Sequence, residues 1–158
     1  APRHPERTSE IERLIREYGF NSIRISQILS ILPNSYSIII LDTIGQLMNY
    51  YALADIVFVG GSLVKIGGHN ILEPALFKKP IIFGPYMFNF KDISEEFLRE
   101  NAAIKVDNSE ELYNKIEELL SEPKKAVLLG ENAYNLIQKN KGIVEKNLAW
   151  IKSIFSGT

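Results

Sequence analysis

The segment Gly67-Gly68-His69-Asn70 has the residue types that can hold an anion. Two glycines stand directly before a helix-like stretch, so the first amides of that helix have little side-chain bulk in front of them. Free amides at a helix start attract phosphate, and the helix dipole adds about 0.3–1 kcal/mol for an exposed anion. The spacing therefore predicts an anion seat, although it does not specify which anion.

The same residues also have a purely structural interpretation. Asn70 and Glu73 have the spacing of a capping box, in which the two side chains satisfy amides at the helix start. Pro74 fits the first turn, where its missing amide does little harm. His69 stands alone, and a lone histidine is more often a hydrogen-bonding core residue than a catalyst. Spacing alone leaves the two interpretations equal.

Composition and missing motifs exclude several other chemistries. The chain contains neither G-x-x-x-x-G-K-[ST] nor G-x-G-x-x-G, which argues against an NTPase and an ordinary NAD domain. A D-x-D pair is absent, so a nucleotide-diphosphate sugar held through a metal is less favoured, and cysteine is absent altogether. We expect neither a metal nor a cofactor. Lysine plus arginine (18) balances aspartate plus glutamate (19), which gives no reason to expect nucleic acid as a partner.

Strands and helices alternate along the first two thirds of the chain. This pattern predicts parallel β-α-β units in a Rossmann-like α/β fold, and the run "YSIIILD" is typical of a strand buried on both faces. Strands are expected at 21–26, 36–42, 55–61, 80–85 and 102–106, helices at 6–18, 45–54, 70–77 and 91–101, and a helical tail of three helices at 108–123, 124–140 and 142–155.

The special segments all lie at the carboxyl ends of expected strands, and "PRH" (2–4) is expected to close a truncated first strand. Parallel sheets bind ligands beyond the carboxyl ends of their strands. We therefore expect four segments to lie together at that edge of the sheet: "PRH" (2–4), "DTIGQ" (42–46), the glycine loop "GGSLVKIGGHN" (60–70) and "GPYMFNF" (84–90). Ser62 in the glycine loop can bind donor oxygens or cap its turn. Lys91 can meet an anionic sugar or be simply solvated.

Size and composition fit one globular domain over residues 1–158. The chain is 46% hydrophobic, which supports a core of its own. It opens "APRHPER" without a methionine, and we expect it to be an excised part of a longer protein. Its apolar runs are too short to span a bilayer.

Residues 58–93, "FVGGSLVKIGGHNILEPALFKKPIIFGPYMFNFKDI", closely resemble the donor-binding half of the Kdo transferases. These are glycosyltransferases of the GT-B class that attach 3-deoxy-D-manno-octulosonic acid (Kdo) from CMP-Kdo to a lipid A precursor. "PRHPER" (2–7) and "DTIGQL" (42–47) resemble two further family segments in the expected order. The resemblance implies the C-terminal half of a GT-B fold, with a missing N-terminal acceptor domain as its partner.

The resemblance also implies where CMP binds. Arg3 and His4 match positions that contact the nucleotide, with Arg3 as the partner of its phosphate. Ile44, Gly45 and Gln46 match a loop against cytosine, although many relatives carry glutamate where this chain has Gln46. A last group receives the phosphate at the helix start and the ribose on its glutamate: Gly68, His69, Asn70, Ile71, Leu72 and Glu73.

The implied reaction is metal-independent displacement of CMP from Kdo, with inversion, by a lipid A hydroxyl. The chain offers donors for the leaving phosphate, but no convincing catalytic base. The resemblance places that base in the missing domain, so we expect the chain alone to bind CMP or CMP-Kdo weakly without turnover. The full-length enzyme is expected at the cytoplasmic face of the bacterial inner membrane.

Three other functions stay open from the sequence. One is a GT-B domain for a different nucleotide sugar, such as a UDP-sugar transferase or epimerase. Another is a non-catalytic module that binds nucleotides or a partner. The third is a structural domain whose glycine loop only permits tight packing.

Overall fold

The structure is a computed structural model that describes residues 1–2, 4–28 and 36–155, with 142–155 described by their main chain. The described residues form two compact units, Ala1–Tyr50 and Tyr51–Thr158. The boundary between the two units falls inside helix α2 (Leu47–Leu53).

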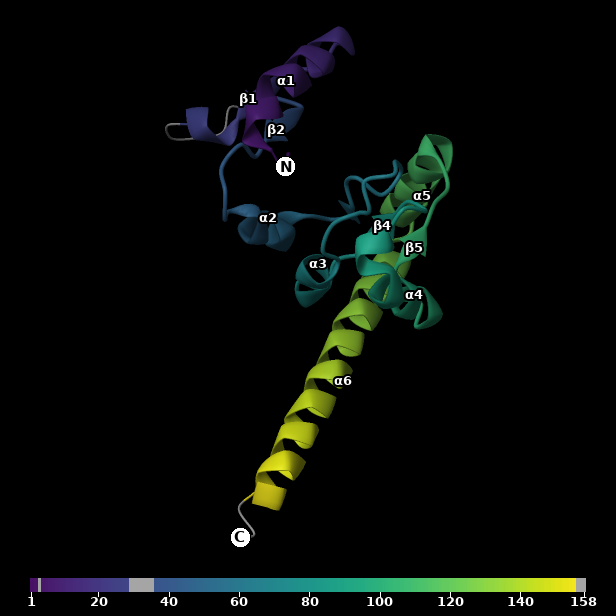
Figure 1. Ribbon diagram of the computed structural model, residues 1–158. Coiled ribbons are helices and arrows are strands. Elements are labelled where there is room, and N and C mark those ends of the chain that lie inside the picture. The colour runs from purple at the N-terminus through teal and green to yellow at the C-terminus, as the bar shows by residue number, and fades with distance from the viewer. Residues whose placement is uncertain (3, 29–35, 156–158) are drawn as a thin grey trace. The chain divides into compact units, whose positions relative to one another are not determined.

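The first unit contains one helix and two parallel strands (Figure 1). Strands β1 and β2 pair in parallel, with Ser22 opposite Ile38. The predicted glycine stop after the first helix is confirmed, because Gly19 has φ +79° and donates its amide to the Arg16 carbonyl. The elements are a short 3₁₀ turn η1 (Pro5–Arg7), α1 (Thr8–Glu17), β1 (Ser22–Arg24), a second 3₁₀ turn η2 (Ile25–Gln27) and β2 (Ile38–Ile40).

The prediction of a strand buried on both faces is wrong for β2. Ile40 is buried, but Ile39 keeps 39% of its surface exposed. In the described residues β2 pairs only with β1, and exposure alternates along it, with Ile39 exposed and Ile40 buried, so only one of its faces is well covered. The sequence also predicts a turn at Pro33-Asn34, which lies outside the described residues.

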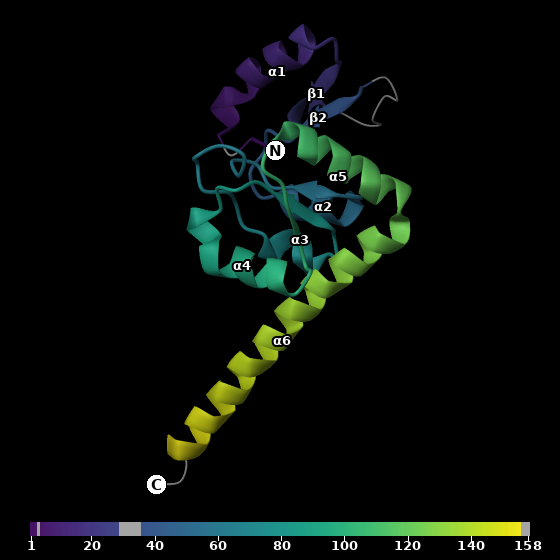
Figure 2. The ribbon, with the colours of Figure 1, turned by 90° about the vertical axis from the view of Figure 1, so that its right-hand side faces the viewer.

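The second unit is a three-stranded parallel sheet with helices around it (Figures 1 and 2). The strand order is β3-β4-β5, with Val57 opposite Ile81 and Ile82 opposite Ile104. Its elements are β3 (Val57–Phe58), α3 (Leu72–Leu76), β4 (Ile81–Phe83), the 3₁₀ turn η3 (Phe88–Phe90), α4 (Lys91–Arg99), β5 (Ile104–Lys105), α5 (Ser109–Ser121) and α6 (Pro123–Phe155).

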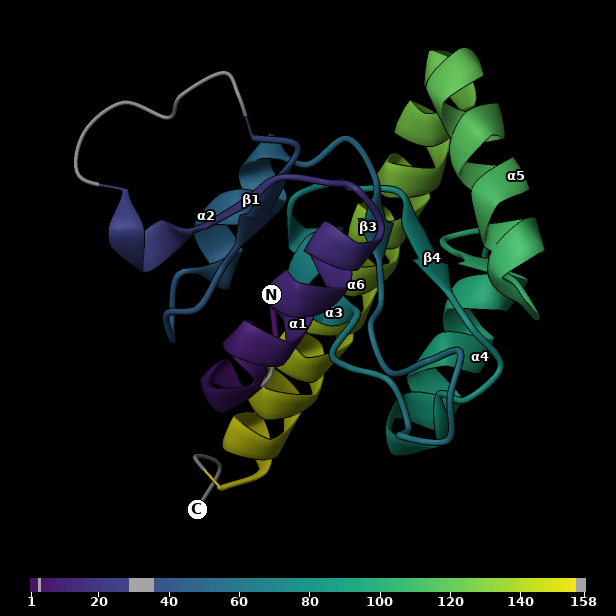
Figure 3. The same ribbon diagram turned by 90° about the horizontal axis from the view of Figure 1, so that it is seen from above.

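Central strand β4 is buried on both faces, as its apolar run predicts. Ile81 and Phe83 belong to a cluster with apolar residues of α3, α4 and α6. Ile82 belongs to a second cluster, with residues of α5 and the start of α6. Helices therefore cover both faces of this sheet, which Figure 3 shows from above. The glycine loop emerges from the carboxyl end of β3 in this packed layer.

The expectation of three separate tail helices is wrong, because residues 123–155 form the single helix α6. Gly142, where a break was expected, lies inside it. A glycine in a helix interior costs about 1 kcal/mol relative to alanine, too little to end a helix whose neighbours favour it. No proline follows to force a stop.

Helix α6 lies very close to the main chain that leads into β4. A Cβ atom on Gly130 would come within 3.0 Å of the Lys78 carbonyl oxygen, so only glycine allows this approach. Lys78 itself has φ +54°, and its Nζ lies 5.1 Å from the centre of the Tyr134 ring on α6. These contacts fix α6 against the amino end of the central strand.

Helices α5 and α6 are also joined by a carboxylate with two cationic partners. Glu118 lies 2.6 Å from Lys115 Nζ on its own helix and pairs with Lys125 on α6. The hydrogen bonds from Lys115 and Lys125 lower the pKa of Glu118 to about 2. A carboxyl with a lowered folded-state pKa stabilises the fold above its unfolded pKa, and this contribution disappears as the pH falls toward 2.

We predict that Glu118→Gln lowers the free energy of unfolding by about 1 kcal/mol near pH 6, since partly exposed ion pairs are weak. The difference from the unsubstituted chain should shrink toward zero near pH 2, as measured by urea unfolding across this range. Glu131→Gln is the control, because Glu131 is exposed on α6 and has no ion pair in the described part of the chain. A difference that persists unchanged at pH 2 would contradict the assignment.

Candidate functional site

The loop between β3 and α3 folds back on itself through its glycines. Gly61, Gly67 and Gly68 all have positive φ, at +71°, +104° and +71°. Most residues other than glycine adopt these conformations only with strain. The Gly68 amide donates to the Gly61 carbonyl at 3.3 Å, so the end of the loop is bonded to its beginning.

The last two glycines of this loop also provide room for another segment. A Cβ on Gly67 would come within 3.0 Å of the Asn89 side chain and the Phe88 ring. A Cβ on Gly68 would meet the sulfur of Met87 equally closely. The bare backbone is thus used for close packing against residues 87–89. The expectation that these glycines leave an open approach to the amides is corrected for Gly68, because its amide is already bonded inside the loop.

Residues 69–73 form a short bonded turn before α3. Asn70 Oδ1 accepts the Leu72 amide at 3.0 Å, and Asn70 Nδ2 donates to Glu73 Oε1 at 3.2 Å. The capping box expected from the sequence is wrong in detail: Ile71 is the residue before the helix, and the Asn70 and Glu73 side chains bond each other. Helix α3 is also shorter than the predicted 70–77. It runs from Leu72 to Leu76, with Ile71 before it and Phe77 as its C-terminal cap.

One amide of this turn remains available for a ligand. Among the described residues, no hydrogen bond takes the main-chain amides of Asn70 and Ile71, but Ile71 is fully buried and only Asn70 is partly exposed. The carboxylate of Glu73 and the side-chain amide group of Asn70 lie beside them, on the carboxyl side of β3. The turn can therefore offer the Asn70 N–H to an anion and one carboxylate to hydroxyl groups. A Cβ on Gly60 or Gly61 would lie 3.8 Å from the His69 ring, so this ring lies beside the start of the loop, as a structural histidine does.

Tyr51 lies near this turn and was not singled out from the sequence. Its ring centre is 6.4 Å from that of Phe77. Burial, and after it the negative charge of Glu73, raises the pKa of Tyr51 to about 12. The phenol therefore stays protonated and neutral near the Glu73 carboxylate at physiological pH. Tyr51 belongs to a helix of mixed polarity, and the sequence pattern there did not indicate that it lies near Glu73.

Ser62 is fully buried and its hydroxyl is fully used. The hydroxyl donates to the Val59 carbonyl at 2.5 Å and accepts the Gly84 amide at 2.8 Å. The Ser62 carbonyl accepts the Tyr86 amide at 2.9 Å. Of the two sequence interpretations, the geometry favours the structural one: Ser62 fastens the residues after β3 to those after β4.

Lys91 is the most exposed candidate of the second unit. It begins α4, its side chain is 70% exposed, and its Nζ lies 4.0 Å from Glu95 Oε1. This geometry fits a solvated lysine with a loose partner. It also leaves the ammonium group accessible, so a role toward an anionic sugar stays a prediction.

The remaining predicted residues belong to the first unit. His4 is exposed, with Nδ1 3.1 Å from Glu6 Oε1. Ile44 is 90% exposed, Gly45 has φ +84°, and the Gln46 carbonyl accepts the Asn49 amide. Arg3 lies outside the described residues. The roles of these residues toward CMP stay predictions from the resemblance.

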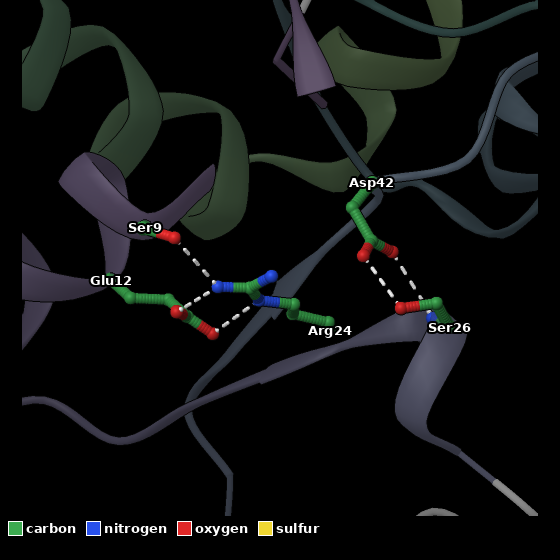
Figure 4. A network of polar contacts seen from close by, with 5 residues as sticks. All are labelled: Ser9, Glu12, Arg24, Ser26 and Asp42. Atoms are coloured by element: carbon green, nitrogen blue, oxygen red, sulfur yellow. Dashed lines mark hydrogen bonds and ion pairs between the residues drawn. The ribbon is translucent and has the colours of Figure 1, made fainter. Parts of the chain in front are cut away.

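A polar network joins α1, β1 and the residues that follow the two strands, and Figure 4 shows its five members. Arg24 binds Glu12 through two nitrogens, at 2.8 and 2.5 Å, and joins β1 to α1. Directly after the two strands, Asp42 accepts the Ser26 amide at 3.1 Å and the Ser26 hydroxyl at 2.6 Å. The side-chain hydrogen bond from Arg24 lowers the pKa of Glu12, and that from Ser26 lowers the pKa of Asp42. Asp42 is therefore a structural anchor for the loop that begins beside it.

Known proteins agree with this arrangement. Residues 26–136 match the family described as glycosyl transferases group 1. The chain belongs to this family. It is 34% identical to the C-terminal CMP-Kdo binding domain of WaaA from Acinetobacter baumannii, whose crystal structure superposes with a TM-score of 0.82 over 87% of this chain and 72% of that one. The predicted parallel-sheet fold with flanking helices is thereby confirmed.

Longer relatives bear the same resemblance. A 3-deoxy-D-manno-octulosonic acid transferase of Haemophilus influenzae is 39% identical over 96% of the chain. A bifunctional glycosyltransferase/methyltransferase of Fusobacterium nucleatum is 42% identical over 77% of the chain. The chain spans 35% of the first relative's length and 19% of the second's. The resemblance to Kdo transferases expected from the sequence is confirmed.

We predict that Ser62→Ala lowers the free energy of unfolding by about 1–3 kcal/mol, because it leaves the buried Gly84 amide without an acceptor. Ser94→Ala is the matched control. Ser94 is also buried, but its hydroxyl only donates to the Lys91 carbonyl, so its loss should cost less than about 1 kcal/mol. Chemical denaturation of both variants measures the difference. Equal losses would show that the Ser62 hydroxyl does not fasten the two strand ends.

Proposed function

We propose that this chain is the donor-binding part of a glycosyltransferase that moves Kdo from CMP-Kdo to a lipid A precursor. The observation that carries the proposal is the match to a CMP-Kdo binding domain, at 34% identity and a TM-score of 0.82. The turn at residues 69–73 supports it independently, because the free Asn70 amide and the Glu73 carboxylate suit a phosphate next to a ribose.

The donor phosphate lies at the Asn70 amide in this proposal, and Glu73 accepts hydrogen bonds from the ribose hydroxyls. Asn70 Nδ2 donates a hydrogen bond to Glu73 Oε1 at 3.2 Å. The carboxylate that receives the ribose hydroxyls is therefore oriented before CMP-Kdo binds. Arg3 supplies a positive charge to the phosphate, and residues 44–46 contact cytosine. These last roles rest on the resemblance alone.

The reaction needs a group that this site lacks. A lipid A hydroxyl oxygen forms the new bond to the anomeric carbon of Kdo, the bond from that carbon to the phosphate oxygen breaks, and CMP leaves with the electron pair. A base must take the hydroxyl proton, and we place it in an N-terminal domain that also binds the acceptor. The chain alone then binds CMP without transferring Kdo.

The acceptor also determines where the parent enzyme works. A lipid A precursor is a membrane lipid, so we propose that the full-length protein acts at the cytoplasmic face of the inner membrane. Within the described residues, none of the helices has the length and apolarity needed to cross a bilayer. We make no assignment of a membrane-attachment site to the residues of this chain.

Calorimetric titration of the 158-residue chain with CMP tests the proposal. We predict weak but saturable binding, and a dissociation constant about tenfold higher or more in Arg3→Ala and Glu73→Ala, since each removes a charged hydrogen-bond partner. Glu131→Ala serves as the control and should bind like the unsubstituted chain. UMP and UDP should compete less well than CMP.

Two results would contradict the proposal. Absence of CMP binding, with the fold intact by circular dichroism, would remove the donor-binding function. Preference for UDP would favour a transferase or epimerase that uses a UDP-sugar.

A further inference from the structure

Residues 87–89 hold the end of the glycine loop from the side of β4. The Asn89 amide donates to the Gly67 carbonyl at 3.2 Å. The Asn89 side chain donates from Nδ2 to the Ile66 carbonyl at 3.3 Å. The same side chain occupies the space where Gly67 would otherwise carry a Cβ. One residue thus contacts two consecutive peptide groups of the loop.

We propose that Asn89 is a positioning residue for the donor nucleotide, an inference that rests on the proposed CMP site. Asn89 does not touch the nucleotide in this account. It sets the path of Ile66 and Gly67, and the chain continues directly through Gly68 and His69 to the partly exposed amide of Asn70.

The turn at residues 69–73 needs support from other segments because few contacts within it fix its conformation. Helix α3 has only five residues, and helices this short are not stable by themselves. The turn before it is held by two hydrogen bonds from the Asn70 side chain. Its entry point at Gly67 and Gly68 would be conformationally free without a neighbour, since glycine has the widest choice of backbone angles.

The position of the Asn70 amide matters because hydrogen bonds to phosphate are short and directional. Donor and acceptor atoms must lie about 2.7–3.2 Å apart, and the bond weakens steeply as its angle bends. A loop that samples several paths presents this amide correctly only part of the time. The observed affinity falls by the fraction of time spent in the binding conformation.

Asn89 is exposed, unlike Met87 beside it, which is buried against Gly68. Removing an exposed side chain that buries no apolar surface should change the global stability little. Its effect should therefore appear in the loop and in CMP affinity. A residue that only supports the core would instead change the melting temperature.

The test compares Asn89→Ala with Asn132→Ala in the 158-residue chain. Asn132 is a matched control because its Nδ2 also donates to a main-chain carbonyl, that of Asn101, at 3.0 Å. The bond lies at α6 of the same unit, and Asn132 is outside the proposed donor site. Amide hydrogen exchange is measured without ligand, and CMP affinity and melting temperature are measured in parallel.

We expect Asn89→Ala to speed exchange of the Gly68 amide and to raise the CMP dissociation constant, each about threefold to tenfold, as loss of one hydrogen bond allows. The melting temperature should stay within about 2 °C of the unsubstituted chain. Asn132→Ala should change neither the Gly68 exchange nor the affinity.

Each alternative outcome is distinguishable. Unchanged Gly68 exchange together with weaker CMP binding would mean that Asn89 contacts the nucleotide itself, which overturns the positioning role. Unchanged exchange and unchanged affinity would overturn it as well. If the unsubstituted chain does not bind CMP, the proposed function fails and the donor-positioning role fails with it, while the exchange measurement still decides whether Asn89 holds the loop.

Discussion

The arrangement of the second unit depends on close approaches to its main chain that only glycine permits. A Cβ on Gly84 would come within 3.0 Å of the Ser62 backbone, and Gly67 and Gly68 are covered by residues 87–89. These contacts bring the segments after β3 and β4 together more closely than side chains would allow. The Ser62 hydroxyl donates to the Val59 carbonyl and accepts the Gly84 amide. These bonds fix the start of the loop that leads to the turn at residues 69–73.

Much of the fold follows from the sequence because its signals are local. Alternating apolar runs predicted the strands and helices of the second unit, and Gly19 predicted the end of the first helix. The sequence also predicted that Asn70 and Glu73 act together at the helix start, as a capping box in which each side chain bonds a main-chain amide. It could not predict that their side chains bond each other, because this depends on where α3 actually begins.

The wrong predictions involve neighbours that are distant in sequence. The glycines were expected to open a path for a ligand, but Gly67 and Gly68 accommodate a segment about twenty residues further along the chain. The pair of Arg24 with Glu12 joins a strand to a helix and matches no helical spacing. A separate helix was expected to begin at Gly142, but a single glycine is too weak a signal to divide a helix without a following proline. Tertiary packing determined the first two outcomes, and the small local cost of a helical glycine determined the third.

The most direct test of the account is a titration of the isotopically labelled chain with CMP, followed by amide chemical shifts. We predict saturable shifts in residues 69–73, and none at Asp55 or Lys79, which lie at the amino ends of β3 and β4. Shifts confined to other parts of the chain, or no shifts at a large excess of CMP, would contradict the placement of the donor phosphate at the Asn70 amide.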